Sequence, residues 1–158
     1  MAHRGWLVLV LAGGLALSGC GATVGGRAVV DRVPDADRAL VDAYVTASNR
    51  AGEQGPQQQA AFLRATQEPG VPLPPDARCF DTTTARARPV ERTLRPAAPD
   101  WRPLTPVGPR PRPPGAVYVM AVSSSLLAGG VPVAEDVRSD YLVIRDGRVY
   151  GYAVCRVG

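Results

Sequence analysis

The stretch "DVRSDYLVIRDGRVYGYAVCRV", residues 136–157, decides the fold, because two alternating runs flank an Asp-Gly pair in it. The first run alternates between two faces, one with Val137, Tyr141 and Val143 and the other with Leu142 and Ile144. The second run places Val149, Ala153, Cys155 and Val157 opposite Tyr150, Tyr152 and Val154. Such alternation is typical of strands with a buried face. Asp146-Gly147 suits a two-residue type I′ turn, so the stretch predicts a β-hairpin.

The segment before this hairpin is more uniformly apolar. "AVYVMAV", residues 116–122, is hydrophobic in both phases of the alternation, which predicts a strand buried on both sides. "SSSLLAGG", residues 123–130, then connects this strand to the hairpin. We therefore expect at least three antiparallel strands in the C-terminal third.

Two helices are predicted nearer the N-terminus. The first begins with Asp35 as its N-cap and places an apolar stripe on one face, while Asn49 points away from it. The stripe consists of Leu40, Tyr44, Ala47 and Ala51. Tyr44 and Phe62 of the next helix are expected to pack in the core, and lining a ligand pocket is the alternative. Pro56 suits the first position of a second helix, which carries Phe62 and Leu63 and ends before Pro69-Gly70.

The middle of the chain, residues 69–115, is dense in proline. Proline lacks the N–H that helices and central strands need, so this part is expected to form loops, edge strands and polyproline II. Only "CFDTTTARARPVERTLR", residues 79–95, has the composition of a strand. The predicted class is α+β, with two N-terminal helices packed on a curved antiparallel sheet of three to five strands.

This order of elements, with the ending "YLVIRDGRVYGYAVC", resembles the NTF2-like (SnoaL-like) superfamily over residues 35–158. The resemblance implies a cone in which helices close the concave side of a curved sheet, often around a pocket. Enzymes of that superfamily usually hold an Asp-His pair in this pocket. The chain departs from the pattern in its long proline-rich segment, residues 96–115, and in its histidine content.

The N-terminus has the layout of a secretory signal peptide. A basic start with Arg4 precedes "WLVLVLAGGLAL", residues 6–17. As a helix this apolar run is about 18 Å long, shorter than the roughly 30 Å hydrocarbon core of a bilayer. The segment is thus expected to direct export without spanning the membrane.

Leu17-Ser18-Gly19-Cys20 resembles the lipobox of bacterial lipoproteins. The resemblance implies that Cys20 receives diacylglycerol and that residues 1–19 are removed. Two or three acyl chains give the stable anchoring that one chain does not. We expect a lipid anchor at Cys20, a tether over residues 20–34 and a single domain over residues 35–158, held at the cell membrane outside the cytoplasm. The alternative is an ordinary signal peptide cleaved after Ala22.

Composition excludes several classes of function. The formal net charge of +4 is too mild to indicate nucleic acid as a partner. His3 is the only histidine and leaves with the signal peptide, and the chain has no lysine. A Ser-His-Asp or Cys-His site, a histidine metal site and a lysine Schiff base are therefore excluded. We predict no metal site and no cofactor.

Cys79 and Cys155 remain after cleavage, in a compartment where thiols are oxidised. An even pair there indicates a structural disulfide. A redox-active pair or metal ligands are the alternatives, but the chain has no C-x-x-C motif.

Two pairs of charged residues are the remaining candidate sites. Asp140 and Glu135 lie near the predicted sheet, where a buried carboxylate with a raised pKa can act as a general base. Arg110 and Arg112 stand two apart on a stiff proline-rich segment that could bind a polyanion. The leading interpretation is a non-catalytic, lipid-anchored envelope protein that binds a protein partner or a small envelope ligand. A pocket enzyme and a polyanion-binding surface protein are the alternatives, and the sequence leaves the oligomeric state open.

Overall fold

The computed structural model describes residues 32–74, 77–80, 82–105, 108–153 and 156–157. The expected signal peptide, the lipidated Cys20, nearly all of the tether and Cys155 lie outside these residues. Among the helices that the structure describes, none combines the length and the apolar character needed to cross a membrane.

Two helices form at the predicted places, α1 (Asp35–Glu53) and α2 (Pro56–Ala65). The predicted N-cap is wrong, because Asp35 is the first residue of α1 and Pro34 occupies the N-cap position. Gly55 separates them at φ 121°, a conformation that glycine adopts without strain. The predicted apolar stripe of α1 is partly wrong: Val41 and Val45 are its buried residues, and Ala47 is exposed. Burying Val41 and Val45 removes more apolar area from water than burying Ala47 and Ala51 would, and Leu40 and Tyr44 still pack partly buried against the core.

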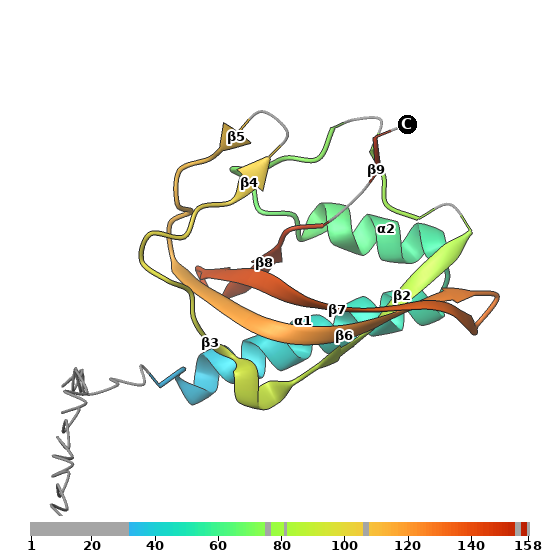
Figure 1. The fold of residues 1–158 in the computed structure, drawn as a ribbon, viewed down its shortest axis with the longest axis horizontal. Coiled ribbons are helices and arrows are strands. Elements are labelled where there is room, and N and C mark those ends of the chain that lie inside the picture. The colour runs from blue at the N-terminus through green and yellow to red at the C-terminus, as the bar shows by residue number, and fades with distance from the viewer. Residues whose placement is uncertain (1–31, 75–76, 81, 106–107, 154–155, 158) are drawn as a thin grey trace, which may run out of the picture.

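A five-stranded antiparallel sheet forms the other layer, in the order β2-β6-β7-β8 with β3 also paired to β6. Its strands are β2 (Thr83–Pro89), β3 (Arg95–Pro96), β6 (Ala116–Ala128), β7 (Val131–Arg145) and β8 (Arg148–Gly151). The sheet curls, and both helices lie on the same side of it (Figure 1). The predicted α+β class and curved antiparallel sheet are confirmed.

Smaller elements connect these layers. A 3₁₀ helix, η1 (Glu91–Thr93), lies between β2 and β3. Two short antiparallel pairs complete the fold: β1 (Ala77–Arg78) with β9 (Arg156–Val157), and β4 (Leu104–Thr105) with β5 (Gly108–Pro109). The proline-rich segment thus contains a small pair of strands as well as loops.

The predicted hairpin is confirmed, and a second one was not foreseen. Asp146 and Gly147 have φ values of 53° and 70°, as a type I′ turn requires. Residues 123–136 do not merely connect strands: Gly129 and Gly130, at φ 57° and 83°, turn β6 directly into β7. The three consecutive serines obscured the strand, because serine has little β-propensity of its own and is held here by pairing with β2.

The sheet carries a hydrophobic cluster on each face, as the alternation predicted. The helix-facing cluster buries Val33, Val41, Val45, Leu94, Tyr118, Met120, Val122, Leu142 and Ile144. The opposite cluster consists of Ala97, Val117 and Val143 with Trp101, Tyr141, Tyr150 and Tyr152 packed against them. Val33, assigned from the sequence to the tether, is only 3% exposed and belongs to the core.

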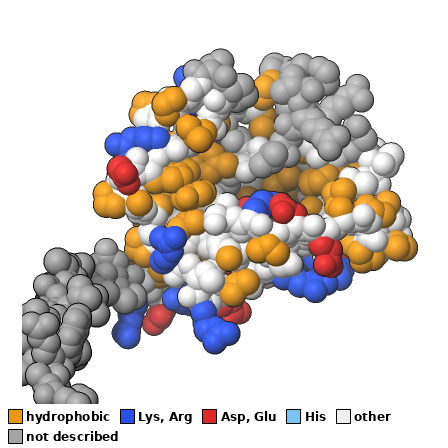
Figure 2. Space-filling view, viewed as in Figure 1, with side chains coloured by type: hydrophobic (Ala, Val, Ile, Leu, Met, Phe, Trp, Pro, Cys, Tyr) orange, Lys and Arg blue, Asp and Glu red, His pale blue; other side chains and the backbone are white. Residues whose placement is uncertain are grey.

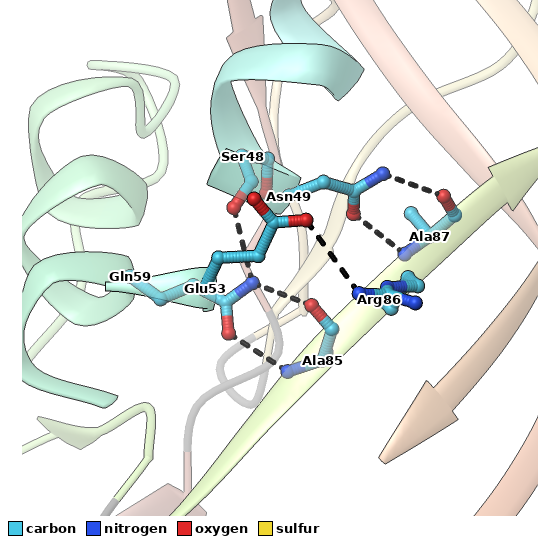
Figure 3. A network of polar contacts seen from close by, with 7 residues as sticks. All are labelled: Ser48, Asn49, Glu53, Gln59, Ala85, Arg86 and Ala87. Atoms are coloured by element: carbon cyan, nitrogen blue, oxygen red, sulfur yellow. Dashed lines mark hydrogen bonds and ion pairs between the residues drawn. The ribbon is translucent and has the colours of Figure 1, made fainter. Parts of the chain in front are cut away.

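Side-chain amides cover the outer edge of β2 (Figure 3). Asn49 of α1 exchanges two hydrogen bonds with the backbone of Ala87. Gln59 of α2 does the same with Ala85, and its Nε2 also donates to the Ser48 carbonyl. The expectation that Asn49 points away from the fold is wrong. These amides take the place of a further strand and hold both helices over the sheet.

Candidate functional site

The main cavity, here called the central hollow, has a volume of about 890 Å³ and lies between the helices and the curled sheet. Figure 2 shows this face of the molecule hollowed, with hydrophobic side chains gathered around the depression. Its apolar walls come from α1, α2, β6, β7 and the loop after β3, and include Tyr44, Val45, Leu63, Met120, Val122, Leu126, Leu142 and Trp101. The size and the lining suit an apolar ligand.

The hollow opens along β7. Asp140 and Leu142 point to the helix side of this strand, whereas Ser139 and Tyr141 alternate to the other side, yet all four line the hollow. A space lined from both faces of a strand must extend past the edge of that strand. The opening is therefore at the edge of β7, beyond the point where its pairing with β8 ends.

Charged side chains stand at this opening. Asp136, Arg138 and Asp140 alternate onto one face of β7 and all line the hollow. Arg138 Nε donates to Asp140 Oδ1 at 2.7 Å, and a second guanidinium nitrogen lies 3.9 Å from Asp136 Oδ2. A general base needs a free carboxylate, and this ion pair occupies Asp140. The geometry brings Asp140 to the hollow but does not favour acid–base chemistry there.

Glu135, the second candidate carboxylate, is exposed and accepts a hydrogen bond of 3.4 Å from Ser125 Oγ. It lines the hollow from the face of β7 opposite to Asp140. Because neighbouring residues of a strand point to opposite faces, the two carboxylates do not form a catalytic pair across one space.

An aromatic group lies beside the opening. Trp101 stacks on Tyr141 with ring centroids 4.2 Å apart, and Tyr152 meets Trp101 edge-on at 5.6 Å. Within the described residues the buried Tyr152 hydroxyl has no hydrogen-bond partner. Burial, together with the negative charge of Glu68, holds the pKa of Tyr152 well above its ordinary value. Tyr152 therefore stays neutral and keeps a proton to donate.

The two candidate anion-binding arginines differ in their surroundings. Arg110 is exposed, whereas Arg112 is partly buried and donates to the carbonyl oxygens of Ala98 and Pro99 at 2.7 and 3.4 Å. Arg112 thus holds the loop after β3. Of the two candidate anion-binding arginines, only Arg110 is exposed.

Among the described residues no cluster of histidine, cysteine and acidic side chains could hold a metal ion. Cys79 is partly buried, directly after β1, and its predicted partner Cys155 lies outside the described residues. No family model, curated protein or solved structure matches the chain.

Sequence reasoning missed most of the residues that form the hollow. Tyr44, Leu63 and Leu142 carried an apolar signal, but that signal does not distinguish a cavity wall from a filled core. Trp101 also carried a signal in the sequence, because a tryptophan in a proline-rich segment needs an apolar surface to pack against.

Proposed function

We propose that this protein is a bacterial envelope lipoprotein, anchored through Cys20, whose domain binds a ligand in the central hollow without catalysis. The central hollow carries the proposal: about 890 Å³ of largely apolar space opens to the surface between the helices and the sheet. Filling such a space with solvent alone is unfavourable compared with filling it with apolar groups. The lipobox sequence supports the anchor.

The fold agrees with the NTF2-like resemblance in class, since two helices lie on one side of a curled sheet. Membership of that superfamily is part of the proposal. A ligand-binding role follows more directly than an enzymatic one, because the only acid on the helix side of β7 that is less than one-third exposed is held by Arg138.

A Cys79–Cys155 disulfide is also part of the proposal. Its support is the pairing of β1 with β9, in which Arg78 and Arg156 are directly opposite each other. Each cysteine is the chain neighbour of one of these arginines. The bond would tie the segment after α2 to the C-terminal end of the chain.

The binding test compares two tryptophan variants of neighbouring β7 residues. Ala134 lines the hollow, whereas Val133 is not among the lining residues and is 57% exposed. The full chain is produced in a bacterial envelope, extracted gently and examined by native mass spectrometry. We expect a bound mass in the wild type and in Val133→Trp that is lost in Ala134→Trp; equal retention by both variants would place the ligand elsewhere.

The anchoring test uses the same preparation. Mass spectrometry of the mature wild type should show diacylglycerol on an N-terminal Cys20, and Cys20→Ala should abolish both the lipid and the cleavage before residue 20. A mature chain that begins after Ala22 would support the ordinary signal peptide instead.

A further inference from the structure

The two outer edges of the sheet differ in how their backbone groups are hydrogen-bonded. Asn49 and Gln59 cover the β2 edge with side-chain amides, which bond the backbone of alternate residues. The β7 edge is covered by β8 only over Leu142–Arg145. Before Leu142, the described part of the chain supplies no strand or side chain that bonds the outer edge of β7.

Hairpin geometry identifies which backbone groups lie on this open edge. Arg145 and Arg148 flank the type I′ turn, so they form a hydrogen-bonded pair and Arg145 directs its N–H and C=O toward β8. Alternate residues of a strand direct these groups to the same side. The register of β7 against β6 is continuous back to Ala134, so Glu135, Val137 and Ser139 direct their backbone groups outward. All three residues are exposed.

The first residues of β7 are protected against pairing by their backbone, whereas those that follow carry only charged side chains as protection. Pro132 lacks an N–H, and the register against β6 shifts between Leu126 and Leu127. Proline and bulges are common protections of exposed strand edges. From Glu135 onward the edge continues without either device and borders the central hollow.

We propose that the central hollow and the open edge of β7 together form a docking site for an extended segment of another polypeptide, which adds to the sheet as a strand. This inference rests on the proposed binding function and names the ligand class. A strand beside β7 would exchange backbone hydrogen bonds with Glu135, Val137 and Ser139. Every second side chain of that strand would enter the helix-side part of the hollow, which Met120, Val122 and Leu142 line.

Charge restricts the partner further. Three carboxylates line the site, on Glu135, Asp136 and Asp140, against the two guanidinium groups of Arg102 and Arg138. Like charges on neighbouring strands are destabilising, so an acidic segment is disfavoured and a neutral or basic one fits. The expected partner segment alternates apolar residues with polar or basic ones and lacks acids.

The face on which each partner side chain lies also determines whether the N–H and C=O of that residue point toward β7. We take the added strand to be antiparallel to β7, like the other pairs of this sheet, and residues paired through hydrogen bonds in an antiparallel pair share one face. The partner residues that bond Glu135, Val137 and Ser139 therefore lie on the face opposite the helices, and the residues between them point into the helix-side part of the hollow. In a peptide of alternating valine and threonine, the valines should enter the hollow and the threonine amides should bond to β7.

The test uses the acetylated and amidated peptide Lys-Val-Thr-Val-Thr-Val-Lys with the mature protein in lipid nanodiscs. Amide hydrogen exchange followed by NMR should slow at Glu135, Val137 and Ser139 when the peptide is added. Methylating the threonine nitrogens should weaken binding about tenfold or more, because two hydrogen bonds are lost, whereas methylating the valine nitrogens should leave it nearly unchanged.

Each other outcome overturns the inference. Equal binding of both methylated peptides, or no protection at saturating peptide, would exclude strand addition. Protection that rises with protein concentration in the absence of peptide would show that a second copy of this chain covers the edge instead. If Ala134→Trp still loses its co-purifying ligand while the edge stays unprotected, the hollow binds a small molecule and only the strand proposal fails.

Discussion

Asn49 of α1 and Ala87 of β2 hold each other through two hydrogen bonds of 2.8 Å. Asn49 Nδ2 donates to the Ala87 carbonyl, and the Ala87 N–H donates to Asn49 Oδ1. An amide side chain reproduces one peptide unit of a neighbouring strand, with a donor and an acceptor side by side. This contact closes the β2 edge and fixes α1 over the sheet, which creates one wall of the central hollow.

Gln59 provides the most direct test of this arrangement. It is 2% exposed and makes three hydrogen bonds, two with Ala85 and one with the Ser48 carbonyl. Gln59→Ala should lower the free energy of unfolding by about 2–3 kcal/mol, because it leaves backbone groups of Ala85 unpaired. Urea denaturation measures the loss. Gln58→Ala, at an exposed position of the same helix, should change it by less than about 0.5 kcal/mol; equal effects would contradict the proposed role.

Gly151 should not tolerate a side chain. A Cβ there would stand 2.4 Å from the Tyr44 hydroxyl oxygen, so Gly151→Ala should destabilise the fold by about 1–3 kcal/mol. In a Tyr44→Phe background the penalty should shrink, because the nearest clashing atom is gone. Thermal unfolding of the four proteins of this cycle gives the coupling energy. Simple additivity of the two substitutions would show that Tyr44 is not the obstacle.

Alkaline pH should destabilise the protein through Tyr118. Burial, with the hydrogen bond that Tyr118 donates to Asp37 and the charge of that carboxylate, raises the pKa of Tyr118 to about 12. The folded state thus holds this proton more tightly than the unfolded state. The stabilisation is complete below pH 10, the ordinary pKa, and is lost as the pH rises from 10 toward 12. Urea denaturation at pH 9 and pH 11 should show a drop that Tyr118→Phe reduces.

Two other tyrosines determine how much of the alkaline loss of stability should remain in Tyr118→Phe. Burial also raises the pKa values of Tyr44 and Tyr152, so a smaller alkaline loss should persist in Tyr118→Phe. An alkaline loss of the same size in wild type and variant would exclude Tyr118 as a main source.

The proposed disulfide makes a quantitative prediction. A Cys79–Cys155 bond closes a loop of about 77 residues, which stabilises the fold by about 4.5 kcal/mol in the chain-entropy model. Cys79→Ser should lose most of this stability, and the further change Cys155→Ser should cost little more. Denatured mass spectrometry should show two hydrogens fewer in the wild type than after reduction. An unchanged mass on reduction would exclude the bond.

Much of the fold could be predicted from local patterns. Pro56 began a helix where it was expected, and Asp146-Gly147 turned a hairpin as expected, because backbone conformation at these residues depends on their own chemistry. The prediction that Leu142 and Val143 lie on opposite faces is also confirmed, because successive side chains of a strand point to opposite faces of the sheet.

Other features depended on partners distant in sequence. Asn49 was expected to point away from the apolar stripe of the first helix, and only the position of β2 beside α1 gives its amide a backbone to bond. Ser123–Ser125 became strand because β2 and β7 pair with them on both sides.

The central hollow shows most clearly how local sequence patterns differ from features that depend on the packing of distant segments. Which residues are apolar and how they alternate can be predicted from the sequence, because both are local properties of the chain. The packing of distant segments places Leu63, Trp101 and Leu142 around an open space and, within the described residues, leaves an edge of β7 unpaired beside it. A cavity is the space that several packed elements leave between them, so it depends on their relative placement and cannot be assigned from any one segment.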